Sequence, residues 1–403
     1  MDDDVEMTDR EAREGRDDGG EERPPLADFL PLVIAVYTVF CAAACVGQVA
    51  YAVALSSQTI FRPIPKRHGY VEMCLTEFSE ATFRTRFRMS KMAFLALCRL
   101  VGPHMFPRPR LDVDTVTYDA VGCCIQRLAT QTTTHSLADK FGLADGSVSD
   151  YLWSFCRIVN THLVPDLISW PSRDEMAEIS ERFARHYALF PGVIGAVDGT
   201  LVPLVWVYHQ TRPDYICRKG FPALNTLAVC DDRLCFRFVS TGWAGSNGDS
   251  HIDGMTLRSQ RNTLVPGRFV LLGDNGFGNS DKLLVPYKGN WDSFSGPQKR
   301  FNWCHTRTRV AIEMAFGRWK GIFQSMKRSP FNPLYTSHAI LTTMALHNMI
   351  QRYDGGEDDD LDEDEDDEDN TMTTVPDTAQ GETARARIAD HLFAGYMGAP
   401  IYR

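Results

Sequence analysis

Paired cysteine motifs are absent from this 403-residue chain. Its eleven cysteines are scattered without a Cys-x-x-Cys pair. Neighbours such as Cys123/Cys124 and Cys230/Cys235 have no histidine partners at the spacing of a zinc finger. Most of them lie in apolar runs, where cysteine behaves as a small buried hydrophobe. The pattern argues against structural zinc and fits a reducing compartment.

Charge is absent between Phe29 and Leu55, a run of 27 residues. A run of this length can span a bilayer, and the basic residues at 62–67 would leave the rest of the chain on the cytoplasmic side. No basic region precedes the run, so it does not resemble a cleaved signal peptide. Two alternatives stay open, a membrane span at 29–55 or an amphipathic or buried helix packed on the folded body.

Two segments of the chain are strongly acidic and contain few or no basic residues. Residues 1–23 hold eleven acids and four arginines, and residues 354–369 hold thirteen acids and no base. The net charge is −10, so the remaining chain carries +10. Such a basic body is typical of a nucleic-acid enzyme. Both acidic segments lack the apolar content to fold, and they either solubilise the chain, contact basic partners or compete with DNA.

Three carboxylates stand out from the rest of the sequence. Asp198 and Asp274 each follow a short apolar run that reads as a buried strand ending at the rim of a sheet. Glu313 lies in a segment of helical periodicity. Taken singly, each acid has an ordinary explanation, as a turn or cap residue or as a helix-surface Glu paired with Arg309. Together they suit hard divalent cations bound through oxygen.

Short sequence motifs that include these acids follow one another along roughly residues 81–350. They resemble the PIF/Harbinger branch of DDE transposases and the nucleases derived from it, with 38 residues between the second Asp and the Glu. The matching motifs are FRMSKMAF, PGVIGAVDGT, YICRKGFPALNTLAVCD, WAGSNGDS, LLGDNGF, HTRTRVAIEMAFGRWK and ALHN.

This resemblance implies an RNase H-like core that cuts DNA with two Mg²⁺ or Mn²⁺ ions and, in intact transposases, transfers the cut strand. Asp198 matches the first catalytic Asp, Asp274 the second and Glu313 the catalytic Glu. Asp249 matches a further family Asp and is a candidate additional metal ligand. The resemblance also implies a Myb/SANT-like DNA-binding partner, a homo-oligomer, and a place in the nucleus alongside the cytoplasm.

We therefore expect an α/β fold, with an RNase H-like mixed sheet flanked by helices and an N-terminal all-α region. The expected strands span 193–198, 224–230, 234–241 and 269–274, with a further stretch at 215–220. The expected parts are an acidic disordered tail at 1–27, an apolar helix at 28–56, a connector at 57–80, a helical region at 81–190, the nuclease domain at 191–353 and a second acidic disordered tail at 354–403.

Within the helical region, residues 116–129, 136–141 and 147–159 predict three helices with the outline of a helix-turn-helix. Gly142 is expected to take the turn. The third helix either enters the major groove of DNA or belongs to a small bundle that supports the catalytic domain. Arg157 is the only basic residue on its exposed face.

Basic residues close to the triad are candidates for contacts with DNA phosphates. His305 could orient a metal or phosphate, although a satisfied capping role is the commoner one. The tryptophans could stack on bases, with core packing as the default. The proposed DNA-binding residues are Arg218, Lys219, Arg307, Arg309 and Lys320.

The leading hypothesis is a metal-dependent DDE endonuclease, either an active transposase with strand transfer or a domesticated relative. The first alternative is a non-catalytic DNA-binding protein that retains the fold. The second is a membrane-anchored scaffold.

Overall fold

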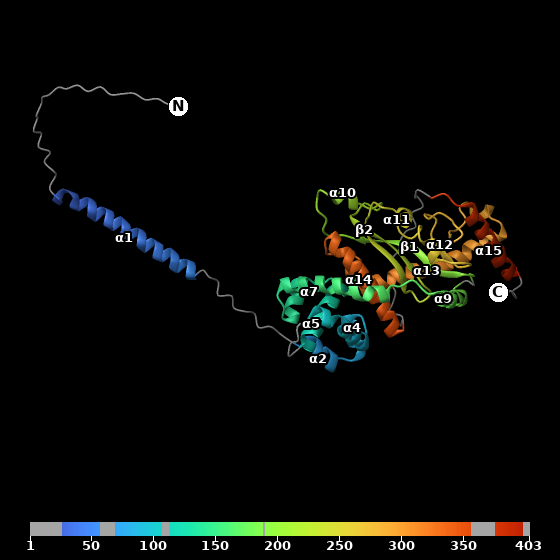
Figure 1. Ribbon diagram of the computed structural model, residues 1–403, viewed down its shortest axis with the longest axis horizontal. Coiled ribbons are helices and arrows are strands. Elements are labelled where there is room, and N and C mark those ends of the chain that lie inside the picture. The colour runs from blue at the N-terminus through green and yellow to red at the C-terminus, as the bar shows by residue number, and fades with distance from the viewer. Residues whose placement is uncertain (1–25, 57–68, 107–112, 188–189, 356–374, 398–403) are drawn as a thin grey trace, which may run out of the picture. The chain divides into compact units, whose positions relative to one another are not determined.

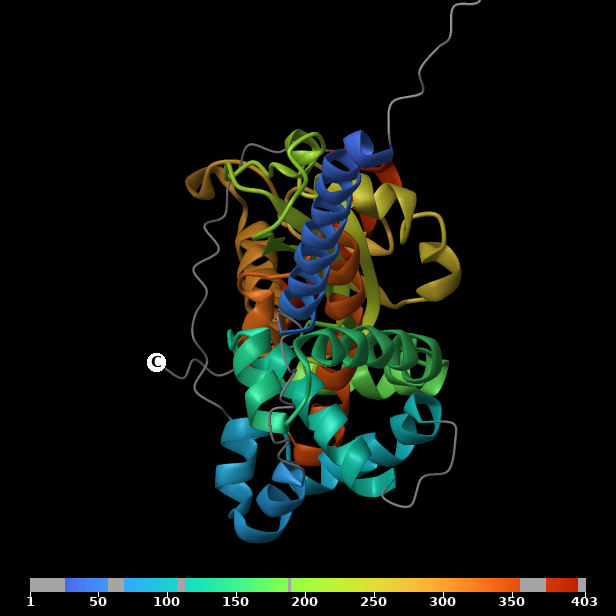
Figure 2. The same cartoon turned by 90° about the vertical axis from the view of Figure 1, so that its left-hand side faces the viewer.

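The computed structural model describes residues 26–56, 69–106, 113–187, 190–355 and 375–397 (Figures 1 and 2). The chain divides into two units, Met1–Ile64 and Pro65–Arg403. Residues 1–25 of the expected tail, residues 57–68 of the expected connector and the acidic run at 356–374 lie outside the described residues.

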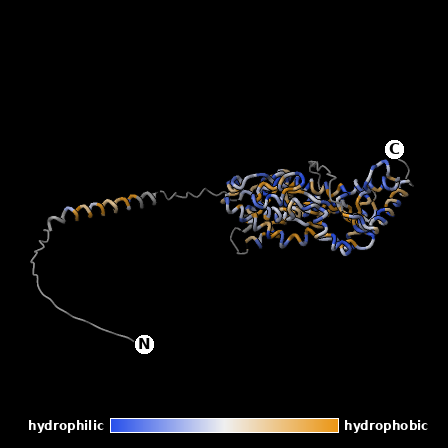
Figure 3. The backbone as a smooth tube through the Cα atoms, turned by 90° about the horizontal axis from the view of Figure 1, so that it is seen from above, coloured by the Kyte–Doolittle hydropathy of each residue, from blue (hydrophilic) through white to orange (hydrophobic). Residues whose placement is uncertain are grey.

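The first unit contains one long helix, α1 (Leu26–Ser56). Its described side chains are exposed, and hydrophobic colour follows the helix in Figure 3. Within the described part of the chain, no helix is long and apolar enough to cross a membrane. The alternative of a membrane span at 29–55 is therefore not supported.

The second unit is built on a mixed five-stranded sheet in the order β3-β2-β1-β4-β5. Strand β1 pairs antiparallel with β2 and parallel with β4; β3 pairs antiparallel with β2, and β5 parallel with β4. This arrangement confirms the predicted RNase H-like class. The strands are β1 (Val193–Pro203), β2 (Ala223–Cys230), β3 (Phe236–Ala244), β4 (Val270–Leu272) and β5 (Leu283–Leu284).

Two details of the sheet differ from the sequence expectation. The stretch 215–220 is not a strand, because it follows a short helix, α10 (Arg212–Tyr215), and turns at Gly220 with φ 85°. Strand β5 was not expected, since two residues are too few to show a periodic pattern. The connection between β3 and β4 contains two short helices, α11 (Asp249–Met255) and α12 (Arg261–Leu264).

Three helices pack against the sheet: α9 (Arg173–His186), α13 (Gly296–Ile322) and α14 (Pro333–Asp354). Helix α9 begins with a capping box, in which the Ser172 hydroxyl accepts from the Glu175 N–H and the Glu175 carboxylate accepts from the Ser172 N–H. Helix α13 begins with a second capping box at Ser295 and Gln298. These caps fix where each helix starts relative to the strands.

The helices before the sheet gather at one end of this unit (Figures 1 and 2). The expected turn is confirmed, since Gly142 ends α6 at φ 64°. Their core is continuous with that of the sheet, and Asn160 donates to the His338 carbonyl of α14 at 3.1 Å. These contacts give the region a supporting role, while DNA reading by its third helix stays a prediction. The helices are α2 (Tyr70–Glu77), α3 (Glu80–Phe87), α4 (Lys91–Met105), α5 (Val113–Ala129), α6 (Thr134–Phe141), α7 (Asp145–Ile158), a π turn at Val159–Leu163 and α8 (Val164–Leu167).

The expectation of a disordered tail at 354–403 is wrong for residues 375–397. They contain helix α15 (Ala379–Met397), which packs on α13 and β5. Ile388, Ala389 and Leu392 are buried in the common core. The apolar content of this helix was hidden in the sequence by the neighbouring run of acids.

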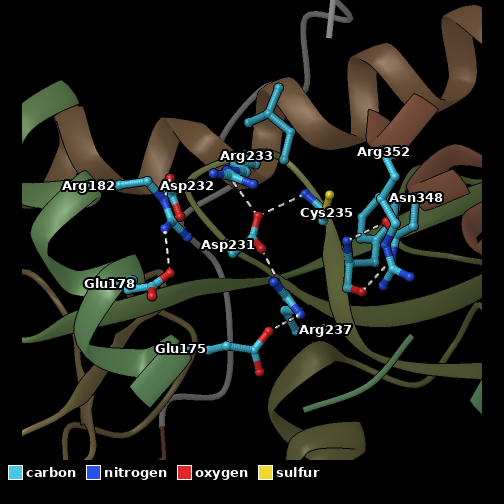
Figure 4. Close-up of polar contacts among 12 residues, drawn as sticks. Glu175, Glu178, Arg182, Asp231, Asp232, Arg233, Cys235, Arg237, Asn348 and Arg352 are labelled. Atoms are coloured by element: carbon cyan, nitrogen blue, oxygen red, sulfur yellow. Dashed lines mark hydrogen bonds and ion pairs between the residues drawn. The ribbon is translucent and has the colours of Figure 1, made fainter. Parts of the chain in front are cut away.

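A polar cluster fixes the β2–β3 turn between α9 and α14 (Figure 4). The fully buried Asp231 accepts from the backbone N–H groups of Arg233 and Cys235 at 2.9 and 3.0 Å. It also accepts from Arg237 Nε at 2.7 Å. Beside it, Arg182 of α9 donates to Asp232 at 2.7 Å. The turn is therefore held by one carboxylate with three donors.

We expect Asp231→Ala to lower the free energy of unfolding by about 3 kcal/mol or more, because it leaves the partly buried Arg237 guanidinium and two N–H groups without their acceptor. Urea unfolding measures this loss. Glu178→Ala is the matched control, since its 70% exposed carboxylate makes only an outlying contact with Arg182; a similar loss in both variants would contradict the role given to Asp231.

A second prediction concerns His347 of α14, whose Nε2 lies 2.9 Å from the Leu234 carbonyl. Burial lowers the pKa of His347 from 6.5 to about 4. Below pH 6.5 the unfolded chain binds a proton that the folded chain refuses, so this group reduces stability as the pH falls. Between pH 7 and 5 the wild type should lose about 2 kcal/mol more unfolding free energy than His347→Gln. Equal losses in urea titrations would refute this account.

Candidate active site

Asp198 lies in the middle of β1, where the fully buried first half of the strand gives way to partly exposed residues. The expected end of this strand at residue 198 is wrong, because β1 continues to Pro203 in its pairing with β2. Its carboxylate accepts from the Gly199 N–H at 2.8 Å and from Arg309 Nη1 of α13 at 2.9 Å. The side chain is 18% exposed.

Asp274 is brought next to Asp198 by the strand register. Ala196 of β1 pairs in parallel with Leu272 of β4, and each acid follows its paired residue by two positions. The Asp274 carboxylate accepts from the Gly276 N–H at 2.9 Å, which fixes the turn after the strand. Asp198 from the middle of β1 and Asp274 from the turn after β4 therefore lie side by side.

Asp249 joins them from the first turn of α11. Its Oδ1 accepts from Asn225 Nδ2 of β2 at 2.7 Å, and the residue is 9% exposed. The carboxylate packs against Gly199, where an added Cβ would lie 1.9 Å from Oδ1. Only glycine allows this approach, so Gly199 makes room for Asp249 beside Asp198.

The charges of these acids act on one another. Burial raises the pKa of Asp198 well above its ordinary value; the Arg309 guanidinium opposes the rise, and the Asp274 and Asp249 carboxylates add to it. Burial also raises the pKa of Asp249, with the Asn225 hydrogen bond opposing and Asp274 adding. Crowded, partly buried carboxylates of this kind favour the approach of a positive charge.

Glu313 reaches the group through Arg309. Arg309 is buried, and its Nη2 lies 2.5 Å from Glu313 Oε1 while its Nη1 holds Asp198. Glu313 is 47% exposed. Glu313 is thus a helix-surface Glu paired with Arg309, as the ordinary explanation of this acid expects. The same guanidinium also ties the helix acid to the strand acid.

The donor set has the chemistry that a hard divalent cation prefers, because every candidate ligand is a carboxylate oxygen. Among the residues that the structure describes, however, no three acidic, histidine or cysteine side chains converge closely enough to hold a metal ion. Arg309 supplies the positive charge between Asp198 and Glu313.

The proposed DNA-binding residues divide into two groups. Arg218, Lys219 and Arg307 are exposed, as a phosphate contact requires. Arg309 and Lys320 are buried, so neither presents a cation to DNA at the surface. Both lie on the inward side of α13, which sequence periodicity alone did not reveal.

His305 is a buried supporting residue of α13. Its Nε2 lies 3.1 Å from the Leu284 carbonyl of β5, and burial lowers its pKa to about 3. It therefore stays neutral and supports the sheet edge next to Asp274 through Nε2, while its Nδ1 is buried without a hydrogen-bond partner among the described residues.

The default of core packing is wrong for several tryptophans. Trp206, Trp291 and Trp303 are exposed, whereas Trp243 is half-buried and donates to Ser240 at 2.8 Å. The sequence reasoning also missed Asn225. Its signal was an amide in the otherwise apolar strand ALNTLAVC.

Known proteins resemble this chain over the region that contains the acids. The pattern of the family described as DDE superfamily endonuclease matches residues 197–348. Protein ALP1-like of Arabidopsis thaliana is 28% identical over 294 residues, which are 67% of this chain and 70% of that protein. No solved structure matches the chain significantly.

Two animal relatives are named as candidate nucleases. HARBI1 of Rattus norvegicus is 34% identical over 164 residues, covering 40% of this chain and 46% of the relative. HARBI1 of Homo sapiens is 31% identical over 218 residues, covering 53% and 61%. These matches and the RNase H-like sheet make the chain similar to DDE superfamily endonucleases over residues 197–348 and to the HARBI1 proteins.

Proposed function

We propose that the protein is a metal-dependent DNA endonuclease that hydrolyses phosphodiester bonds with Asp198, Asp274 and Glu313. The observation that carries this proposal is the placement of Asp198 in β1 level with Asp274 after β4, with Glu313 joined to Asp198 by Arg309. The family match and the names of the animal relatives support the same reaction class.

Asp198 and Asp274 would hold the cations, with Glu313 and Asp249 as further oxygen donors. Two Mg²⁺ or Mn²⁺ ions, when bound, supply activation of the attacking water or 3′ hydroxyl and stabilisation of the leaving oxygen. Asn225 holds the Asp249 carboxylate in place, and the Gly199 N–H does the same for Asp198. Arg309 neutralises the acids while no cation is present.

The finer parts of the proposal follow the family resemblance. Strand transfer, a Myb/SANT-like partner, self-association and a nuclear location belong to it as expectations. The basic body and the exposed Arg218, Lys219 and Arg307 support DNA as the substrate.

A second candidate function is DNA binding without cutting. It is favoured by the arrangement of Arg309, because a guanidinium that already bridges Asp198 and Glu313 can stabilise this group of acids without metal.

A cleavage assay separates the two functions. Full-length protein is incubated with labelled duplex DNA and Mg²⁺ or Mn²⁺. We expect the wild type to nick the duplex and Asp198→Ala or Asp274→Asn to lose roughly a hundredfold to thousandfold in rate, since several kcal/mol of transition-state stabilisation depend on the cations.

Asp281→Asn is the control, because it removes a 45% exposed carboxylate only seven positions after Asp274. It should nick at the wild-type rate. Binding of DNA without nicking by the wild type would instead establish the non-catalytic function.

A further inference from the structure

An exposed tryptophan on α13 is enclosed by two arginines. Trp303 is 41% exposed. The guanidinium carbon of Arg300 lies 4.5 Å from its ring centre, and that of Arg307 lies 4.6 Å from it. The arginines stand three residues before and four residues after Trp303, so one helix face carries all three. The indole restricts the motion of both cations.

The C-terminal helix completes this surface. Tyr396 of α15 is exposed, and Arg300 lies over its ring at 4.8 Å as well. Helix α15 approaches α13 so closely that a Cβ at Gly296 would lie 2.7 Å from the Phe393 ring. Arg300 is thus fixed between aromatic rings from two helices.

A third cation extends the group, since Lys299 lies 5.9 Å from the ring centre of Trp291, which is 50% exposed. We call the whole group the aromatic–basic patch; it consists of Trp291, Lys299, Arg300, Trp303, Arg307 and Tyr396.

The cations of the patch are not neutralised by acids. In the part of the chain that the structure describes, Lys299, Arg300 and Arg307 make no ion pair, in contrast to Arg309 two residues further along α13. Arg300 Nε is buried without a hydrogen-bond partner among the same residues. Three cations held by rings but not by carboxylates leave their charge available to an external anion.

We propose that the aromatic–basic patch binds the DNA backbone to one side of the phosphodiester that is cut. This proposal rests on the proposed function and names a further contact surface for the same substrate. A guanidinium can hold a phosphate through two hydrogen bonds. An arginine ordered beforehand by aromatic rings loses less conformational entropy on binding, and the exposed rings can stack on unpaired bases.

The position of the patch suits this role. Trp303 precedes Glu313 by ten residues on the same helix, which is about 15 Å along the axis at 1.5 Å per residue. That separation equals about four base-pair steps. One short duplex can therefore reach both the acids and the patch.

The test measures DNA binding in EDTA, where no cutting occurs. A labelled duplex of about three helical turns is titrated with full-length protein at several salt concentrations. We expect Arg300→Gln/Arg307→Gln to weaken binding about tenfold or more and to lower the slope of log K against log salt by about 1.8, one phosphate contact for each arginine.

Two further variants show whether the rings matter. Trp303→Ala should weaken binding severalfold without any change in charge, whereas Trp303→Phe, which keeps a ring, should restore most of it. The charge-matched control is Arg185→Gln/Arg233→Gln, which alters two exposed arginines outside the patch. Thermal unfolding checks that every variant is folded.

The outcomes are distinct. If Arg300→Gln/Arg307→Gln binds DNA with the affinity and salt slope of the wild type, the proposal for the patch is wrong. An equal loss of affinity in the control pair would also contradict it. If the patch variants bind normally while the wild type nicks DNA, the patch alone fails. If the patch variants lose binding while the wild type never nicks, the patch stands and the endonuclease fails.

Discussion

The guanidinium of Arg309 is the interaction on which this site depends. It is buried, it holds Asp198 of a strand and Glu313 of a helix, and it does so next to two further carboxylates that raise the pKa of Asp198. Without a positive charge at this point, four acids around one sheet edge would repel one another. A divalent cation and Arg309 are therefore alternative means of satisfying the same charge.

The rest of the fold positions these acids. Parallel pairing of β1 with β4 brings Asp198 level with Asp274, and Gly199 leaves the space that Asp249 fills. A capping box fixes the start of α13, and α15 packs along this helix. The helix that carries Glu313 thus also carries the aromatic–basic patch, so substrate contacts and acids are set by one rigid element.

Local hydrogen bonds alone decide the caps at Ser90 and Ser172. The sequence predicted Asp198 and Asp274 because an apolar run followed by Asp indicates a buried strand, although it ended the first strand at 198 and β1 continues to Pro203. It could not predict the exposure of Trp303 or the ordering of α15, because both depend on contacts between distant segments. The role of Gly199 required the position of Asp249, which only the folded chain supplies.

The most direct test of the account measures Mn²⁺ binding to the full-length protein by calorimetry in the absence of DNA. The acidic runs of the sequence are the same in every variant, so the decisive quantity is the difference between wild type and Asp274→Asn. We predict a saturable class of sites in the wild type that is lost in Asp274→Asn and kept in Asp281→Asn. Identical titrations of all three proteins would contradict the claim that these acids form a cation site.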